Sequence, residues 1–367
     1  MPKKFIKAID FFCSGGGMTK GMHLAGIKVI AGIDFDPECK ATYERNNKGS
    51  KFIQADIFQL KAVQLQKLLG LTKNDDNLLL IGCSPCQFWS FIRTDKRKSE
   101  QSKNLLREFN RFTKYFNPGY IVVENVPGIM SRKDESGLTE FVNDLEKRGY
   151  MVKYEVVDLN EYAVPQTRKR FSLIASRVSD KFIFPVKSKK VKPTVRDFIG
   201  TKNGFPKVRA GHIDNSKFQH TVSQLSDKNL QRLRGTRANG GSAMWWRNDK
   251  KLGRERYCGD GFTDTYSRMA WDKAAPTITT KFNSLSNGRF GHPEENRALS
   301  IREGATLQTF PKSYVFISSS IGGAAKMIGN AVPPEYAKRI GKAIINSSQI
   351  RRTQKIHLKF ELISDKK

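Results

Sequence analysis

The chain of 367 residues is 38% hydrophobic and 10% aromatic, so it can bury the core of one large globular domain or of two. Lys and Arg number 65 against 35 Asp and Glu, and the net charge of +30 favours a polyanionic partner, nucleic acid above all. No apolar stretch approaches the length of a membrane span, and five cysteines, an odd number, argue against a disulfide framework and for a reducing compartment.

Strand and helix patterns alternate through the first half of the chain, and this rhythm predicts an α/β fold with a mostly parallel sheet. The predicted strands cover residues 6–12, 28–33, 52–55, 77–81, 120–123, 151–157 and 171–175. The predicted helices cover residues 18–25, 37–46, 60–69, 104–116 and 139–148.

The rhythm breaks near Pro185, where short pieces rich in Gly, Asn, Ser and basic residues begin. It returns only near residues 321–345, where Pro333 and Pro334 open an amphipathic helix. This pattern predicts four parts. They are a catalytic sheet domain over 1–185, an inserted domain over 186–322, a helix over 323–350 that completes the sheet domain, and a basic tail over 351–367.

A glycine cluster follows the first predicted strand and opens the first helix, in the run Asp10-Phe11-Phe12-Cys13-Ser14-Gly15-Gly16-Gly17. Glycines at this place let a ligand approach the backbone, and a helix N-terminus favours anionic groups. NAD, FAD and adenosyl cofactors all use such a turn, so the turn alone does not identify the ligand. We predict that Phe12, Ser14, Gly15 and Gly17 form part of a cofactor site.

The next two predicted strands end in residues that suit a nucleoside. Asp34 follows the second strand, where a ribose hydroxyl would bind, and Phe35 beside it offers an aromatic face. Asp56, followed by Ile57, comes after the third strand and suits the exocyclic amine of adenine. Capping of the following helix is the alternative role of Asp34, because Asp is a favoured residue at a helix N-terminus.

Cys86 lies in a run, residues 82–87, that follows the apolar strand 77–81. Pro85 fixes the backbone and cannot continue a strand, so we expect Cys86 at an exposed turn, where its thiolate would be a strong nucleophile. The alternatives are an incidental buried cysteine, or a redox pair or half a zinc site formed with Cys83. No second CxxC or His pair completes a metal site, so no metal is predicted.

Four motifs follow the glycine turn in order: Gly82-Cys83-Ser84-Pro85-Cys86-Gln87, Glu124-Asn125-Val126, Gln166-Thr167-Arg168-Lys169-Arg170 and Gly329-Asn330-Ala331-Val332. Together with residues 297–303 and 307–311, they resemble the DNA (cytosine-5)-methyltransferases of the bacterial restriction-modification type. The resemblance covers residues 5–178 and 275–345. It implies a Rossmann-like, S-adenosylmethionine-dependent methyltransferase sheet with a smaller target-recognition domain. Ser14 and Ala163 depart from the family, which usually has glycine at both positions.

The resemblance implies that the Cys86 thiolate adds to carbon 6 of cytosine and so activates carbon 5. Glu124, with a raised pKa, would protonate or hydrogen-bond N3, while Arg168 and Arg170 would anchor the base carbonyl. A buried ion pair that braces the sheet is the alternative role of these three residues, and Asn125 is expected to support the turn. S-adenosylmethionine would supply the methyl group and leave as S-adenosylhomocysteine. By the same resemblance, four further residues line the cofactor pocket: Pro85, Leu105, Asn330 and Ala331.

A cytosine inside a duplex must be flipped out before a thiol can reach it, so DNA contacts should surround the site. Residues 88–104 have the composition of a lid that closes over DNA, and residues 186–290 occupy the place of the target-recognition region. The predicted DNA contacts are Gln87, Ser90, Arg93, Lys96, Arg247 and Arg254. A solvated loop and a generally Lys-rich composition are the alternatives. At least one of Trp245 and Trp246 is expected in the core, and His292 is expected to have a structural role more readily than a phosphate contact.

The sequence thus predicts a sequence-specific enzyme that methylates cytosine in double-stranded DNA. We expect a cytoplasmic monomer of a prokaryotic or phage-infected cell, with a cognate restriction endonuclease, where one exists, acting separately. The nearest alternative is a tRNA cytosine-5 methyltransferase on the same scaffold. A non-catalytic DNA-binding relative would be expected to lack one of the four motifs, and a dinucleotide oxidoreductase has no use for Cys86 beside Glu124.

Overall fold

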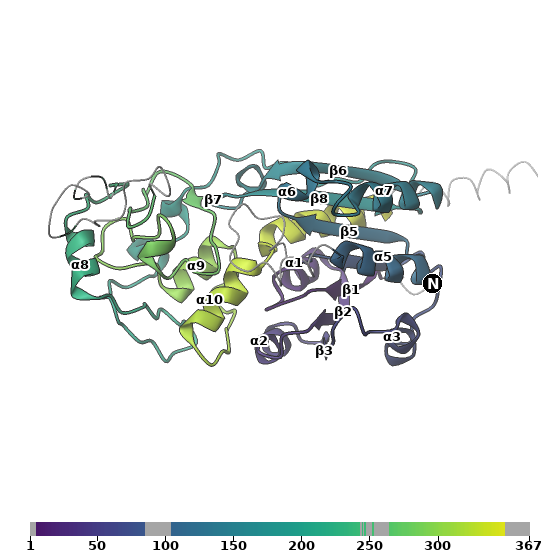
Figure 1. Ribbon diagram of the computed structural model, residues 1–367, viewed down its shortest axis with the longest axis horizontal. Helices are drawn as coiled ribbons and strands as arrows, with labels where there is room; N and C mark the ends of the chain where they lie inside the picture. The colour runs from purple at the N-terminus through teal and green to yellow at the C-terminus, as the bar shows by residue number, and fades with distance from the viewer. Residues whose placement is uncertain are drawn as a thin grey trace, which may run out of the picture.

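The computed structural model describes residues 5–84, 104–242, 244, 246, 252 and 264–348. Figure 1 shows two lobes. The sheet lobe comprises residues 5–84, 104–184 and 334–348, and the small lobe comprises the described residues from 195 to 316. Helix α10 (Ile321–Asn330) lies between them. The domain boundaries expected at residues 185 and 322 stay a prediction.

Seven strands form the main sheet, in the order β3-β2-β1-β4-β5-β8-β6. The strands are β1 (Lys7–Phe11), β2 (Lys28–Asp34), β3 (Lys51–Gln54), β4 (Leu78–Gly82), β5 (Tyr120–Asn125), β6 (Met151–Asp158) and β8 (Lys169–Ser176). The first five pair in parallel, whereas β8 runs antiparallel to both β5 and β6. The prediction of an α/β fold with a mostly parallel sheet is therefore confirmed.

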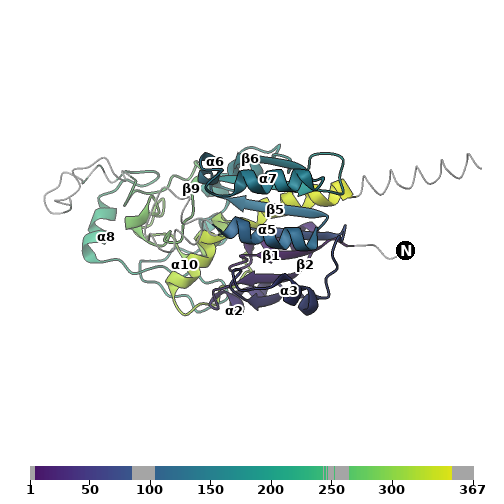
Figure 2. The same cartoon turned by 45° about the vertical axis from the view of Figure 1, so that its right-hand side comes forward.

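Helices cover both faces of this sheet (Figure 2). The helices are α1 (Gly17–Ala25), α2 (Cys39–Asn46), α3 (Ala62–Leu69), α5 (Leu105–Phe116), α7 (Leu138–Lys147) and a helix over 334–348. The side chains of β4 alternate between the two faces. Leu78 and Leu80 pack with α3, α5 and α7, while Leu79 and Ile81 pack with α1 and the helix over 334–348. Burying one such side chain fully stabilises the fold by about 1.5–3 kcal/mol.

The structure also contains short elements that the sequence did not predict. They are α6 (Gly128–Ser131), the 3₁₀ turns η1 (Leu159–Tyr162), η2 (Val195–Asp197), η3 (Thr201–Asn203) and η5 (Leu285–Asn287), the strands β7 (Gln166–Thr167) and β9 (Ala275–Pro276), and the helices α8 (Asp227–Arg234) and α9 (Ile301–Leu307). β7 pairs in parallel with β9 and so connects the two lobes. The segment around residues 269–280 thus folds back toward the sheet lobe.

Buried arginines hold the irregular backbone of the small lobe together. Arg268 is 2% exposed and donates hydrogen bonds to four backbone carbonyls, those of Leu233, Thr236, His292 and Glu295. Arg302 is also buried and donates to the carbonyls of Phe218 and Tyr314. These side chains satisfy carbonyl groups that a strand ladder satisfies in a regular sheet. Trp246 is buried too and donates to the hydroxyl of Thr236, so the expectation that one of the two tryptophans is core is confirmed.

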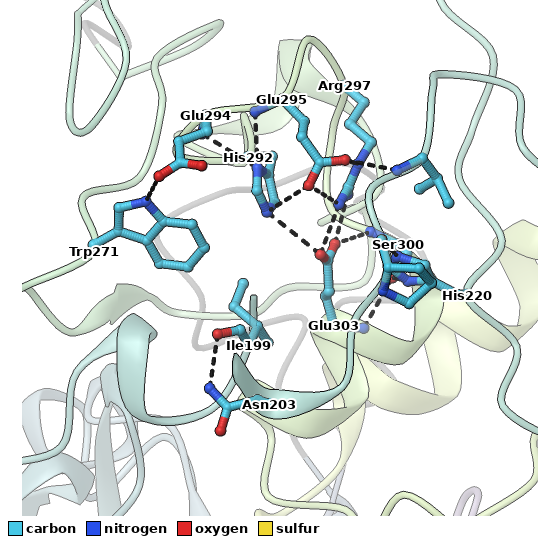
Figure 3. Close-up of polar contacts among 12 residues, drawn as sticks. Ile199, Asn203, His220, Trp271, His292, Glu294, Glu295, Arg297, Ser300 and Glu303 are labelled. Carbon is cyan, nitrogen blue, oxygen red and sulfur yellow. Dashed lines mark hydrogen bonds and ion pairs between the residues drawn. The ribbon is translucent and has the colours of Figure 1, made fainter. Parts of the chain in front are cut away.

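The small lobe also contains a buried charged cluster around Arg297 and Glu303 (Figure 3). Arg297 bonds both carboxylate oxygens of Glu303, at 2.7 and 2.8 Å, and it also pairs with Glu295. His292 accepts the backbone N–H groups of Glu294 and Glu295 on Nδ1, so its ring proton lies on Nε2, which faces Glu295 and Glu303. Burial lowers the pKa of His292 to about 4. His292 therefore has the structural role that the sequence analysis favoured.

Candidate active site

The predicted site residues gather where the parallel strands of the sheet lobe end. β1 and β2 lead into Phe12 and Asp34, Asp56 follows β3, and β5 carries Glu124. β4 lies between β1 and β5 and ends at Gly82, and Ser84, two residues further on, is buried. Chemistry in open α/β sheets collects at this edge.

The first turn adopts a backbone that explains one departure from the family. Phe12 and Ser14 have φ angles of 62° and 45°, in the left-handed region. The backbone N–H of Ser14 donates to Asp34 Oδ2 at 2.8 Å, so the turn and the end of β2 are joined. Left-handed backbone costs a residue with a side chain about 1–2 kcal/mol, which accounts for the family's usual glycine at position 14. Ala163 has a φ of 65°, so the same explanation applies there.

The glycines of this turn are required by close packing against the C-terminal part of the chain. A Cβ atom at Gly17 would lie 2.6 Å from the carbonyl oxygen of Val332 and 2.9 Å from the Cβ of Ala331. A Cβ at Gly15 would lie 3.2 Å from Met327 on α10. The turn therefore touches the segment that was predicted to line the cofactor pocket from the other side.

The end of β2 combines a shielded carboxylate with an open aromatic ring. Asp34 is 8% exposed and accepts backbone N–H groups from Ser14 and from Asp36, the latter at 3.0 Å. Burial raises its pKa. Phe35 is 64% exposed. Helix α2 begins after Glu38, so Asp34 is not its N-cap, and the alternative role considered from the sequence is wrong.

The remaining residues predicted to bind the cofactor come from four separate segments of the sequence. Asp56 is exposed and accepts the N–H of Phe58, whereas Ile57 beside it is buried. Leu105 is the buried first residue of α5. Asn330 ends α10 and is exposed, and Ala331 after it is buried. Pro85 lies outside the described residues.

Glu124 on β5 is a buried carboxyl group that faces an arginine on the neighbouring strand, β8. Its Oε1 atom lies 3.3 Å from Nε of Arg170, and the side chains of the two residues are 8% and 15% exposed. Within the described part of the chain, this oxygen accepts no hydrogen bond. Burial raises the pKa of Glu124, while the charges of Arg170 and Arg168 act in the opposite direction. A carboxyl group in this setting can hold a proton and deliver it to a bound base.

Arg168 makes different contacts from Arg170. Its two terminal nitrogens donate to the backbone carbonyls of Ile278, Gly329 and Ala331, at 3.0, 3.3 and 3.2 Å. The geometry therefore favours Arg170 over Arg168 as the arginine that works beside Glu124. Asn125 donates to the hydroxyl of Ser84 and accepts the N–H of Val126, so it supports the turn as expected.

Several predicted residues fall outside the described part of the chain. They are the catalytic candidate Cys86, the DNA-contact candidates Gln87, Ser90, Arg93, Lys96, Arg247 and Arg254, and Trp245. These assignments stay predictions.

Three polar residues beside the site lie in segments quoted above but were given no role of their own from the sequence. Asp10 is fully buried in β1, burial raises its pKa to about 7, and the hydroxyl of Thr19 donates to it at 2.7 Å. Gln166 and Gln308 are also fully buried. A charged residue inside an apolar strand was the available signal for Asp10, whereas nothing in the sequence pattern around the two glutamines indicates burial.

No group of three or more His, Cys, Asp or Glu side chains is arranged to hold a metal ion in residues 5–84, 104–242 and 264–348 or in the three isolated described positions. In the same part of the chain, no helix is long and apolar enough to cross a membrane.

Comparison with known proteins gives a consistent result. Residues 6–346 match the family model described as C-5 cytosine-specific DNA methylase. The Type II methylase M.HgiDII of Herpetosiphon aurantiacus is 38% identical over 340 residues, which cover 92% of this chain and 94% of that protein. The Type II methyltransferase M1.HphI of Haemophilus parahaemolyticus is 31% identical over 92% of this chain and 86% of its own length.

Solved structures share the fold. A putative DNA modification methyltransferase from an Escherichia coli prophage superposes with a TM-score of 0.72 at 20% identity, and the match covers 94% of this chain and 99% of that one. The Dnmt2 methyltransferase of Schizosaccharomyces pombe gives a TM-score of 0.60 at 18% identity, over 92% and 97% of the two chains.

Proposed function

Because the chain belongs to the C-5 cytosine-specific DNA methylase family, we propose that it methylates carbon 5 of cytosine in a specific double-stranded DNA sequence at the carboxyl edge of its sheet. The reaction class is that of a DNA (cytosine-5-)-methyltransferase. The single observation that carries the assignment of the site is the buried pair of Glu124 and Arg170 at the end of β5.

Carbon 5 of cytosine is a poor nucleophile and must be activated before it can accept a methyl group. In our proposal the Cys86 thiolate forms a bond to carbon 6, and electron density moves toward N3 and carbon 5. Glu124 donates a proton or a hydrogen bond to N3, and burial favours this role because it raises the pKa of the carboxyl group. Arg170 steadies the carboxyl group and the base carbonyl from the neighbouring strand. After methylation, loss of the carbon 5 proton and departure of Cys86 restore the ring.

The residues at the ends of β1, β2 and β3 fit a nucleoside-bearing methyl donor. Asp34 retains lone pairs beyond its two backbone contacts, and a carboxylate suits the hydroxyl groups of a ribose. Phe35 presents an open aromatic face, and the exposed carboxylate of Asp56 suits an exocyclic amine. S-adenosylmethionine bound here would supply the methyl group. The remaining residues proposed to hold it are Phe12, Ser14, Gly15, Gly17, Ile57, Pro85, Leu105, Asn330 and Ala331.

We assign sequence recognition to residues 186–322. Extracting a base from the duplex costs a few kcal/mol, and contacts to flanking phosphates can offset that cost. The net charge of +30 supports such contacts. The side chains proposed to make them are Gln87, Ser90, Arg93, Lys96, Arg247 and Arg254.

The printed names of the relatives suggest the biological setting. Both curated relatives named above are Type II enzymes, and by analogy we propose that this chain acts as a monomer in the cytoplasm of a prokaryotic or phage-infected cell. A cognate restriction endonuclease would then act as a separate protein.

Bisulfite sequencing of a plasmid carried by cells that express the protein tests this function. Cytosines in one short sequence should resist conversion with the wild-type protein, and all should convert with Cys86→Ser. Glu124→Gln should lower the methylation rate at the same sequence by roughly 10²–10⁴-fold, the usual contribution of a positioned acid. A fully converted plasmid from cells with soluble wild-type protein would overturn the proposal.

A further inference from the structure

A buried polar junction joins the two lobes where β7 meets β9. The side chain of Gln166 is fully buried, and its Oε1 accepts the backbone N–H of Ile278 at 2.9 Å. Its Nε2 donates to the carbonyl of Leu307 at 2.8 Å and to Oε1 of Gln308 at 2.7 Å. One glutamine of the sheet lobe therefore bonds two separate segments of the small lobe.

Gln308 extends the junction to the end of α10. Its Nε2 donates to the carbonyl of Ile328 at 2.7 Å and to that of Ala331 at 3.2 Å. Arg168 donates to the same carbonyl of Ala331 and also to that of Ile278. Residues 330 and 331 belong to the proposed cofactor pocket, and Ala331 packs directly on Gly17. The junction thus contacts both the small lobe and the segment proposed to line the cofactor pocket.

The spacing of the motif connects this junction to the catalytic carboxyl. Along the extended segment 166–170, Gln166 and Arg168 are buried and Arg170 is half-buried, whereas Thr167 and Lys169 between them are exposed. This alternation places Gln166, Arg168 and Arg170 on one side of the chain, because side chains of an extended strand alternate between its faces. Gln166 and Arg168 hold the junction, and Arg170 pairs with Glu124.

We propose that Gln166, Arg168 and Gln308 are positioning residues for methyl transfer. They fix the small lobe and the end of α10 relative to β8, the strand that carries Arg170. The residues proposed to bind the nucleoside, Asp34 at the end of β2 and Phe35 after it, do not contact the junction residues in the described hydrogen bonds. Loosening the junction therefore displaces the bound partners relative to one another more than it weakens the binding of either. Small displacements of this kind can lower a rate about 10²-fold. This inference rests on the proposed roles of Glu124 and Arg170.

Gln308→Met tests the proposal, since it keeps the length of the side chain and removes the bonds to Gln166, Ile328 and Ala331. Thr306→Val is the matched control. Thr306 lies on α9, the helix that Gln308 directly follows, and its buried hydroxyl has no hydrogen-bond partner within the described residues. Single-turnover methyl transfer is measured with saturating DNA and S-adenosylmethionine, and the Kd of each is measured separately. We expect Gln308→Met to lose at least tenfold in rate with both Kd values within threefold of wild type, and Thr306→Val to keep its rate within twofold.

A rate within twofold of wild type for folded Gln308→Met would overturn the proposal, and so would a loss that saturating DNA restores. Gln166→Met attacks the junction from the sheet side and should show the same separation of rate from binding, so the test survives if Gln308→Met does not fold. The two changes should be non-additive in the double variant, because both break one shared contact. Glu124→Gln is measured in parallel. If it keeps the wild-type rate, the proposed catalytic role fails, whatever the junction variants show.

Discussion

The sheet lobe and the small lobe satisfy their backbones in different ways. In the sheet lobe, strand ladders pair the main-chain groups, and apolar side chains such as Leu79 and Leu80 fill both faces. In the small lobe the backbone is irregular, and buried arginines such as Arg268 and Arg302 bond the carbonyl groups that no ladder pairs. Both lobes bury apolar side chains, so the difference between them lies in how the backbone carbonyls are bonded.

This difference changes how the net charge of +30 should be interpreted. Arg168, Arg268, Arg297 and Arg302 are all buried, so part of the positive charge supports the fold and is not presented to DNA. Counting basic residues therefore overstates the surface available for phosphate contacts. The comparison also predicts that the two lobes respond differently to the loss of a single side chain.

The largest effect on stability is expected from Arg268→Met. This change keeps much of the apolar stem but takes away the arginine donor of the Thr236 and His292 carbonyls, whereas the carbonyls of Leu233 and Glu295 keep a backbone N–H. Because buried polar groups that lose their partners are costly, we expect a loss of about 3–5 kcal/mol in the free energy of unfolding. Urea denaturation measures it. Arg289→Met is the control, since Arg289 forms an exposed pair with Asp264 and should cost no more than about 1 kcal/mol. Equal effects of the two changes would show that a buried arginine supports the small lobe no more than an exposed one does.

Acid should weaken the small lobe next most strongly, through His292. Its pKa is about 4 in the folded protein against 6.5 ordinarily, so below pH 6.5 the unfolded chain binds a proton that the folded chain does not. Stability attributable to His292 is therefore complete above pH 6.5 and falls by about 3 kcal/mol as the pH drops to 4. His292→Asn, which keeps an acceptor for the N–H groups of Glu294 and Glu295, should show a shallower loss over this range. Parallel curves for variant and wild type in urea titrations between pH 6.5 and 4 would exclude this role.

In the sheet lobe, a small apolar deletion should have a modest and pH-independent effect. Ile81→Val removes one methylene from a fully buried position on β4 and should cost about 0.5–1.5 kcal/mol. The cost should be equal at pH 7 and pH 5, because no titratable group is involved. A cost that changes by more than 1 kcal/mol between these pH values would show that the sheet lobe also depends on charge.

The smallest effect on stability is expected at Ala163, which has a φ of 65° and lies three residues before β7. Glycine removes the strain of left-handed backbone, about 1–2 kcal/mol, but loses about 0.5–1 kcal/mol through its larger entropy in the unfolded chain. Ala163→Gly should therefore stabilise the protein by between zero and about 1.5 kcal/mol, seen as a small rise in Tm. A fall in Tm would mean that the methyl group has packing value that outweighs the strain.

The same contrast explains how far the sequence could be interpreted. Every strand of the main sheet was predicted, because apolar runs and alternation are periodic signals over several residues. The helices α8 and α9 were missed. The strands β7 and β9 were also missed, because a strand of two residues cannot establish a period. The sequence also placed Glu124 and Arg170 together, yet it could not separate Arg170 from Arg168. That distinction depends on the carbonyls of Ile278 and Ala331, which are more than 100 residues away in the chain.

The most direct test of the central claim is covalent trapping of the enzyme on its own target. DNA that carries 5-fluorocytosine at the site found by bisulfite sequencing is incubated with the enzyme and S-adenosylmethionine, and the products are separated under denaturing conditions. Fluorine cannot leave carbon 5 as a proton does, so the proposed mechanism stops at a protein–DNA adduct. Peptide mapping should find this adduct on Cys86 and on no other cysteine, and Cys86→Ser should form none. If ordinary cytosine is methylated at that site but no adduct forms, or if the adduct maps to a different residue, the proposed mechanism is contradicted.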